Sequence, residues 1–267
     1  MPGDAFVRTA YALSNGTVDD VAATLKIQAA ALWAVIAVET SGCGFLSSRK
    51  PTILFERHIF SRLTNGQYDD GDISSPTPGG YGPFGEHQYD RLTMAIAKNR
   101  TAALQSASWG LGQIMGTNYS SAGFASVEEM VAAMCESEDA QLRAMVNFLV
   151  ASKLHIPLQS QNWASFARGY NGPNYAINRY DIRLQGEFQK YSTAGIPDLS
   201  VRAGQLYLTY LGFHPGSIDG IAGSRTLSAL HDFEAQKSLP VSSMMDETAL
   251  QQLLLALQPL GTGASAA

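Results

Sequence analysis

An apolar segment that ends in a single acid is the clearest feature of the hydrophobic pattern. Residues 27–38 carry no charge, and Glu39 follows them directly. At helical spacing Leu32, Ile36 and Glu39 share one face, which predicts a core helix with a carboxylate beside apolar side chains. Two glycines just beyond are typical of a helix stop, so we expect Glu39 in the last turn.

The remaining periodicity predicts a mainly α fold with a small β element. We expect helices over 6–13 and from Thr17 onward, separated by a break at 15–16. The short apolar run 51–55 is bounded by proline and predicts a strand. Further helices are expected over 91–97, 101–106, 127–134, 140–150, 163–170, 178–191, 201–211, 224–236 and up to Leu257.

Two glycine-rich segments interrupt this pattern. Residues 65–85 hold Gly, Pro, Asp and Ser with almost no periodicity, so we expect a long loop. Its aromatic residues Tyr68, Tyr81 and Phe84 favour a binding rim. Residues 108–116 continue the helical stretch before them, and their three glycines indicate backbone packed closely against a helix or a ligand.

A change of composition near residue 192 predicts two domains. We expect a larger domain over 1–191, a linker over 192–199 and a small three-helix domain over 200–258. About sixty residues is near the lower size for independent folding. The tail over 259–267 is polar and small, and we expect it to be disordered.

Charge and hydropathy argue against nucleic acid and membrane partners. The 267 residues are 45% hydrophobic and carry a net charge of -5, whereas a nucleic acid backbone favours a basic face. No run of about eighteen apolar residues is uninterrupted, and residues 1–4 lack the start of a signal peptide. We therefore expect a soluble monomer made in the cytoplasm.

The two cysteines match no metal-ligand spacing. Cys43 and Cys135 lie far apart, and the sequence leaves open whether they are two thiols or one disulfide. His58, His87 and His155 also lack metal spacing and receive no role. No metal or cofactor is predicted.

Glu39 is the first candidate for acid–base chemistry. Burial beside apolar residues and the negative end of the helix dipole both disfavour its carboxylate and raise its pKa. A proton donor to a leaving oxygen needs such a raised pKa. Two alternatives stay open from the residues alone: a partly exposed glutamate, or a glutamate paired with a nearby arginine.

Three motifs, in their order along the chain, resemble the goose-type lysozyme and lytic transglycosylase superfamily. They are an acid ending a helix at 38–42, an S-x-x-G-L-x-Q-x-M segment at 108–115 and a Tyr-Asn-Gly turn at 167–172. More closely, ILFERHIF, the GGYG loop, SASWGLGQIMG and FARGYNGP are similar to the N-acetylmuramidase domain of tailed-phage endolysins. The resemblance spans roughly residues 15–190 and implies a lysozyme-like catalytic domain.

The resemblance implies that Glu39 is the general acid that cleaves the β-1,4 bond between N-acetylmuramic acid and N-acetylglucosamine. Glu56, in the ILFER motif, is the candidate for the second carboxylate, which positions water or stabilises positive charge. An ion pair with Arg57 or His58 is the structural alternative for Glu56.

Further residues are candidates for substrate contact or for an auxiliary role. The candidate substrate contacts are Gln113, Tyr170, Asn171, Tyr81 and Trp109. Local roles remain open for them: bonds from the Gln113 amide to backbone, a core position for Tyr170, a left-handed turn at Asn171. For Trp109 a core position is favoured. The loop acids Asp69, Asp70 and Asp72 are outside candidates, because turn formation is their ordinary role.

The C-terminal part resembles the three-helix peptidoglycan-binding domain of wall hydrolases. The residues that carry this resemblance are Gly204, Gln205, Leu211, Gly212, Ile218, Asp219, Gly220, Ile221, Gly223 and Thr226. Glu234 departs from it, since glutamine is common after the phenylalanine there. Together the two parts imply a peptidoglycan hydrolase that lyses the wall after release or delivery to the periplasm. A lytic transglycosylase that leaves 1,6-anhydro ends and a non-catalytic wall-anchoring protein are the alternatives.

Overall fold

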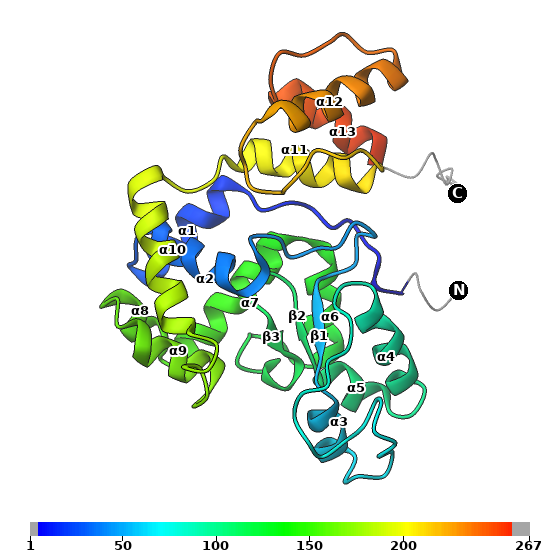
Figure 1. Ribbon diagram of the computed structural model, residues 1–267, viewed down its shortest axis with the longest axis vertical. Coiled ribbons are helices and arrows are strands. Elements are labelled where there is room, and N and C mark those ends of the chain that lie inside the picture. The colour runs from blue at the N-terminus through cyan, green and yellow to red at the C-terminus, as the bar shows by residue number, and fades with distance from the viewer. Residues whose placement is uncertain (1–4, 258–267) are drawn as a thin grey trace, which may run out of the picture. The chain divides into compact units, whose positions relative to one another are not determined.

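The computed structural model describes residues 5–257 and divides into two compact units (Figure 1). Unit 1 holds the chain up to Tyr11 and Asn15–Ile196, whereas unit 2 holds Ala12–Ser14 and the chain from Pro197 onward. The boundary after Ile196 lies inside the range expected as a linker. The expected tail over 259–267 lies outside the described residues.

Unit 1 is mostly helical, as the periodicity predicted. Its helices are α1 (Asn15–Leu25), α2 (Ala29–Thr40), α3 (Arg57–Leu63), α4 (His87–Ile96), α5 (Arg100–Gln105), α6 (Val127–Glu136), α7 (Glu138–Ala151), α8 (His155–Gln159), α9 (Trp163–Asn171) and α10 (Tyr180–Ala194), with a short 3-10 turn η2 (Gly116–Asn118). Because α10 continues to Ala194, the chain is still helical where the linker was expected to begin.

The predicted helix over 6–13 is wrong. Residues 7–14 form no helix, and Tyr11 makes an isolated parallel bridge with Ser137. The Phe6 ring lies 5.4 Å from that of Tyr89 and 5.7 Å from that of Trp109, between centroids. Tertiary packing of this segment therefore overrides its weak helical pattern.

A three-stranded antiparallel sheet supplies the β element. The predicted strand is confirmed as β1 (Ile53–Phe55), which pairs with β2 (Ala107–Trp109), and β2 pairs with β3 (Ile114–Met115). The segment 108–116 is therefore a strand, a turn and a strand, not a continuation of the helix before it. The chain turns here because Gly110 and Gln113 adopt positive φ angles of 67° and 47°.

The central helix of unit 1 is α2, which is apolar on all sides and buried from Ala30 to Val38 except for Ala37. Figure 1 shows α10 running beside it, and the two helices are in extensive contact. The helix ends at Thr40, where Ser41 adopts a left-handed conformation and its N–H donates to the Ala37 carbonyl. The prediction that Glu39 lies in the last turn is confirmed.

Membrane-spanning potential was evaluated for the helices of the described range. None of them alone is long and apolar enough to cross a membrane, although α1 and α2, bent by 110°, meet the length and composition criteria as a pair.

Buried polar side chains of α7 fix the loops beside the end of α2. The Glu138 carboxylate accepts a hydrogen bond from the Gly44 N–H at 2.8 Å, and the Gln141 amide accepts one from the Leu111 N–H at 2.7 Å. Both acceptors are fully buried. A Cβ atom at Gly110 would lie 2.6 Å from the Gln141 side chain, so the close approach requires glycine.

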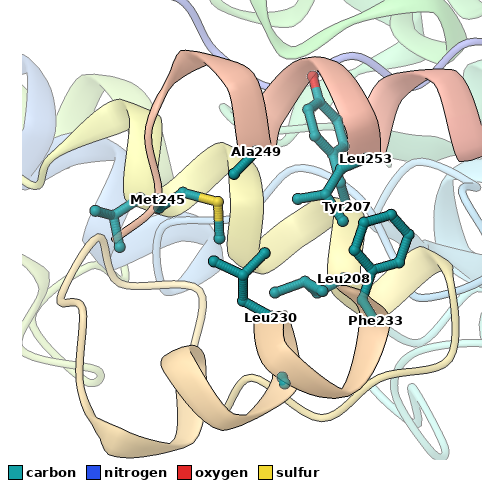
Figure 2. Close-up of a cluster of buried hydrophobic side chains, with 9 residues drawn as sticks. Tyr207, Leu208, Leu230, Phe233, Met245, Ala249 and Leu253 are labelled. Atoms are coloured by element: carbon teal, nitrogen blue, oxygen red, sulfur yellow. The ribbon is translucent and has the colours of Figure 1, made fainter. Parts of the chain in front are cut away.

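Unit 2 is the expected three-helix domain, built from α11 (Leu199–Tyr210), α12 (Ser224–Lys237) and α13 (Glu247–Leu257). Figure 2 shows its interior, where Tyr207, Leu208, Leu230, Phe233 and Met245 pack together. The unit thus has a hydrophobic core of its own. This core is what a domain of about sixty residues needs to be stable.

The close packing on α7 predicts a stability effect of Gly110→Ala. We expect a loss of more than about 1 kcal/mol in the free energy of unfolding, because alanine is strained at positive φ and its methyl group meets Gln141. Gly195→Ala is the matched control: φ is 82° there, but nothing lies within 4 Å of the added carbon. Chemical denaturation should show the larger loss for Gly110→Ala, and equal losses would contradict the packing argument.

Candidate active site

Glu39 lies half-buried at the end of α2, between residues of α9 and α10. The Asn171 side chain donates a hydrogen bond to its carboxylate at 3.1 Å. Arg183 donates to the Val38 carbonyl at 3.0 Å, which brings its positive charge near the carboxylate. Burial outweighs both groups and raises the pKa of Glu39 from 4.5 to about 7. The half-buried side chain and the nearby Arg183 retain features of both alternatives left open by the sequence, but desolvation has the largest effect on the pKa.

The Tyr-Asn-Gly turn connects Glu39 to the sheet. The Tyr170 hydroxyl donates to the Gly112 carbonyl at 2.5 Å, and its ring stacks on Phe166. Burial and, after it, the nearby Glu39 raise the pKa of Tyr170 well above its usual value. The left-handed turn left open as a local role for Asn171 is absent, because Asn171 is still helical and Gly172 takes the positive φ of 85°.

Glu56 stands between β1 and α3 with its side chain 16% exposed. Its carboxylate lies 3.0 Å from Nδ1 of His58, and the Tyr81 hydroxyl is its other electrostatic neighbour. Burial raises the pKa of Glu56, while His58 and Tyr81 act in the opposite direction. Arg57 instead donates to the Gly79 carbonyl at 2.8 Å. Of the two partners that the sequence offered for Glu56, His58 therefore lies beside its carboxylate, whereas Arg57 bonds to the loop backbone.

Two tyrosines connect the surroundings of the two acids. Burial and then the charge of Glu39 raise the pKa of Tyr180, the first residue of α10. Burial, Glu56 and the neighbouring Tyr180 raise the pKa of Tyr81. The electrostatic influence of Glu39 thus reaches Tyr180, and that of Tyr180 and Glu56 reaches Tyr81.

Tyr180 and Arg183 were missed by the sequence reading. The Arg183 guanidinium carbon lies 5.3 Å from the centroid of the Tyr180 ring, a cation–π contact. Both residues follow the FARGYNGP motif on the next helix. A signal could have come from their i,i+3 spacing, which places them on one helix face.

The side chains of Gln113 and Trp109 form hydrogen bonds with other groups of the protein. The Gln113 amide donates to the Thr52 and Gly110 carbonyls at 3.1 and 2.9 Å and accepts from the Ser108 hydroxyl at 2.8 Å. This is the local role left open for it. Trp109 is 0% exposed and its indole N–H donates to the Leu104 carbonyl, so it is a core residue and does not contact sugar.

The segment 65–85 is a loop, as predicted, since it contains neither helix nor strand. Its acids make local contacts: Asp69 accepts from the Ser74 hydroxyl, and Asp72 pairs with Arg91 at 3.2 Å. The aromatic residues differ in exposure. The Phe84 side chain is 71% exposed, whereas Tyr68 stacks on Phe60 at a centroid distance of 6.0 Å.

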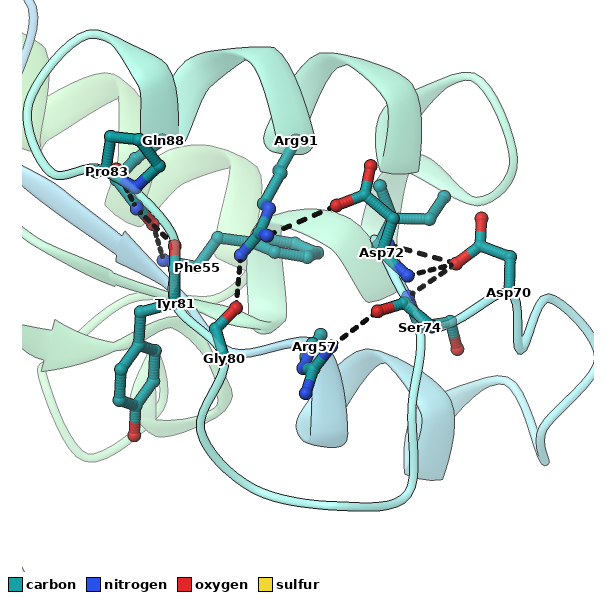
Figure 3. A network of polar contacts seen from close by, with 12 residues as sticks. Phe55, Arg57, Asp70, Asp72, Ser74, Gly80, Tyr81, Pro83, Gln88 and Arg91 are labelled. Atoms are coloured by element: carbon teal, nitrogen blue, oxygen red, sulfur yellow. Dashed lines mark hydrogen bonds and ion pairs between the residues drawn. The ribbon is translucent and has the colours of Figure 1, made fainter.

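The loop acid Asp70 forms a turn as well. Its carboxylate accepts from the N–H groups of Asp72, Ile73 and Ser74 at 2.8 to 3.3 Å (Figure 3). These contacts hold the Asp70 carboxylate within the turn.

Unit 2 has two hollows that share lining residues. The larger has a volume of about 470 Å³ and is lined by Thr209, Phe213, His214, Pro215, Gly216 and Arg225. The second, of about 290 Å³, shares the last three of these residues and extends to Asp219. The buried Gln205 amide accepts from the N–H groups of Asp219 and Gly220 at 3.0 and 2.9 Å, which fixes this wall.

Glu234, the departure from the family pattern in unit 2, has a structural role. It is fully buried and accepts from the Ser242 N–H at 3.1 and 3.0 Å, one distance to each oxygen. Its carboxylate thus holds the loop between α12 and α13.

Residues 5–257 contain no group of three or more His, Cys, Asp or Glu side chains that could hold a metal ion. Cys43 and Cys135 are thiols, not a disulfide. Burial raises the pKa of the Cys135 thiol to about 12.

The raised pKa predicts that Glu39→Gln stabilises the protein at alkaline pH. A rise from 4.5 to about 7 corresponds to about 3 kcal/mol of destabilisation above pH 7, where both states are ionised. The penalty disappears below pH 4.5, where both states are protonated. We therefore expect a gain of about 3 kcal/mol at pH 8 and about 1 kcal/mol or less at pH 5 in chemical denaturation.

The exposed Glu128 provides the control for this experiment, since Glu128→Gln should change stability little at either pH. A gain from Glu39→Gln that is equal at pH 5 and pH 8 would contradict a buried, protonated Glu39.

Comparisons with known proteins agree with this geometry. Residues 28–192 match the N-acetylmuramidase family, and residues 198–253 match a peptidoglycan binding domain family. The crystal structure of Burkholderia AP3 phage endolysin is similar, with a TM-score of 0.63 and 37% sequence identity over 72% of this chain and 75% of that chain. A comparison with curated proteins found no significant match. The chain therefore belongs to the N-acetylmuramidase family, and it is a peptidoglycan-cleaving glycoside hydrolase with a C-terminal peptidoglycan-binding domain.

Proposed function

We propose that this protein is an endolysin that cleaves the β-1,4 bond between N-acetylmuramic acid and N-acetylglucosamine with Glu39 as general acid. The observation that carries the proposal is the desolvated carboxyl of Glu39, whose pKa of about 7 keeps a proton available near neutral pH. The leaving oxygen of a glycosidic bond needs such a donor. The likeness to a phage endolysin supports a role in wall lysis.

Glu56 is the second carboxylate in this proposal. It activates water or stabilises the positive charge that develops on the sugar. Burial raises the pKa of Glu56, and the nearby His58 and Tyr81 offset this in part, in favour of the ionised form that the role requires. Through Tyr81 and Tyr180 it borders the same site as Glu39.

The other candidates receive supporting roles. Asn171 orients the Glu39 carboxylate by its hydrogen bond, and Tyr170 ties the helix of Asn171 to the hairpin. Gln113 shapes the turn of that hairpin. Sugar contacts then come from the half-buried Tyr81 and Tyr180 rings, since aromatic faces pack against sugar rings through their apolar surface.

Unit 2 holds the enzyme on its insoluble substrate. Tethering raises the local concentration of the catalytic site at the wall, so a weak binding module is sufficient. We place its ligand in the two hollows that Arg225 lines, because its exposed guanidinium suits the carboxylates of the peptide stems. The chain acts as a monomer after release or delivery to the wall.

Glu39→Gln is expected to reduce the cleavage of purified peptidoglycan by about 10²-fold or more while the fold stays intact. Mass spectrometry of the products, before and after borohydride reduction, is the measurement. The unmodified protein should release fragments with reducible muramic acid ends. Exposed Glu128→Gln is the matched control and should retain activity.

Other outcomes separate the competing functions. Retained activity in a folded Glu39→Gln variant would refute the assignment of the acid. Anhydro ends would identify a lytic transglycosylase, and binding to sacculi without released fragments would identify a wall-anchoring protein.

Arg225→Gln is expected to weaken binding to purified sacculi several-fold and to leave the turnover of short soluble glycan fragments unchanged. Loss of the guanidinium removes a charge-assisted hydrogen bond from the hollow, whereas the catalytic unit is untouched. Co-sedimentation with sacculi measures the first effect. Lys237→Gln, an exposed residue on the same helix but outside both hollows, is the control. An equal effect of both substitutions would contradict the placement of the ligand in the hollows that Arg225 lines.

A further inference from the structure

The 65–85 loop is fixed beside Glu56 by a buried amide from α4. Gln88 is fully buried, and its carbonyl oxygen accepts from the Phe55 N–H at 2.9 Å. The same amide donates to the Tyr81 carbonyl at 2.9 Å and the Pro83 carbonyl at 2.6 Å. One side chain therefore joins the strand residue before Glu56 to the backbone of Tyr81.

Two arginines hold the loop residues just before Tyr81. Arg57, the residue after Glu56, donates through Nε to the Gly79 carbonyl at 2.8 Å. Arg91 donates to the Gly80 carbonyl at 2.7 Å and pairs with Asp72 (Figure 3). The carbonyls of three consecutive residues, 79 to 81, are thus each held by a different side chain.

The backbone at Gly80 is adapted to this arrangement. Its φ is 65°, and a Cβ atom there would collide with the Arg57 guanidinium. Glycine is therefore required both for the turn and for the close approach of the arginine.

The attachment decides where the Tyr81 side chain lies. Figure 3 shows its ring extending away from Gln88 and Arg91, on the far side of the loop backbone. Its hydroxyl lies near the Glu56 carboxylate, because each of these groups shifts the pKa of the other. Because the neighbours of Glu56 on both sides help to hold the loop, any shift of the loop would change the position of Tyr81 relative to Glu56.

We propose that Tyr81 is a positioning residue for Glu56. Gln88, Arg57 and Arg91 fix the backbone of residues 79–81 and thereby the place of Tyr81. Its hydroxyl donates to the carboxylate, which favours the ionised form and restricts the side chain to one orientation. The inference rests on the proposed role of Glu56 as the second carboxylate. It gives Tyr81 a function in turnover that differs from sugar contact.

The expected pH effect follows from the groups that face Glu56. These are His58 on α3 and Tyr81 on the loop, with Tyr180 of α10 beyond Tyr81. Removal of the Tyr81 hydroxyl removes one influence that lowers the pKa of Glu56, so that pKa rises further. A base loses activity as pH falls through its pKa, and the acidic limb of the rate profile therefore moves to higher pH. His58 is present in every variant compared, so it does not account for the difference.

The test compares Tyr81→Phe with Tyr68→Phe in the full-length protein. Both remove one hydroxyl from the same loop, but the Tyr68 hydroxyl donates to the Lys98 carbonyl at 3.3 Å. With soluble uncrosslinked glycan strands as substrate, we expect Tyr81→Phe to lower kcat by about tenfold or more and to leave KM within about twofold. The acidic limb of its kcat profile should move to higher pH, whereas Tyr68→Phe should match the unmodified protein. Circular dichroism verifies that both variants are folded.

A double-mutant cycle adds a second readout. If Tyr81 acts through Glu56, the variant with both Tyr81→Phe and Glu56→Gln should be no slower than Glu56→Gln alone. Gln88→Met should reproduce the kinetic change of Tyr81→Phe. It removes the hydrogen bonds that hold the loop, while the Tyr81 hydroxyl and the Glu56 carboxylate are chemically unaltered.

Each contrary result has one meaning. A higher KM with unchanged kcat and an unmoved acidic limb in Tyr81→Phe would overturn the positioning role and leave Tyr81 as a sugar contact alone. Full activity of Glu56→Gln would instead overturn the proposed role of Glu56, on which this inference rests. Loss of activity in Glu39→Gln tests the general acid alone and bears on neither the role of Tyr81 nor that of Glu56.

Discussion

Desolvation of one carboxyl group at the end of an apolar helix is the constraint on which the catalytic unit depends. Glu39 is carried by α2, the most buried helix of the unit, so its side chain emerges among apolar residues. Asn171 and Arg183 compensate for this only in part, and the pKa of Glu39 stays raised to about 7. A group held in this way lowers the stability of the fold at alkaline pH, and in the proposed mechanism it supplies a proton donor near neutral pH.

The surrounding structure fixes the segments that meet at this carboxyl. The loop after α2 is held by Glu138 and the hairpin by Gln141, both from α7. Tyr170 then ties α9 to the same hairpin. Fully satisfied buried polar contacts of this kind favour a single arrangement, because each unmade hydrogen bond would leave a desolvated group without a partner.

Around Glu56 the structure is fixed by side chains that bond to an irregular loop, and not by packed helices. Here an irregular loop is kept in place by side chains that hold its carbonyls, chiefly Gln88, Arg57 and Arg91. Backbone without helix or strand must find its hydrogen bonds elsewhere, and these side chains provide them. The loop can therefore present Tyr81 as reliably as a regular element would. In unit 2, Gln205 and Glu234 hold loops in the same way.

The sequence by itself determined the mainly helical class, the strand at 53–55, the three-helix C-terminal domain and the place of Glu39 in the last turn of α2, because periodicity and glycine stops are local signals. The motifs in their order also sufficed to identify the family. Tertiary structure alone decided that residues 7–14 are not helical, that 108–116 form a hairpin and that Glu56 pairs with His58 instead of Arg57. It also brought Tyr180 and Gln88 to the site, because contacts between residues far apart in the chain leave no periodic trace in the sequence. Their positions depend on how distant segments pack, and packing is decided only when the whole core is assembled.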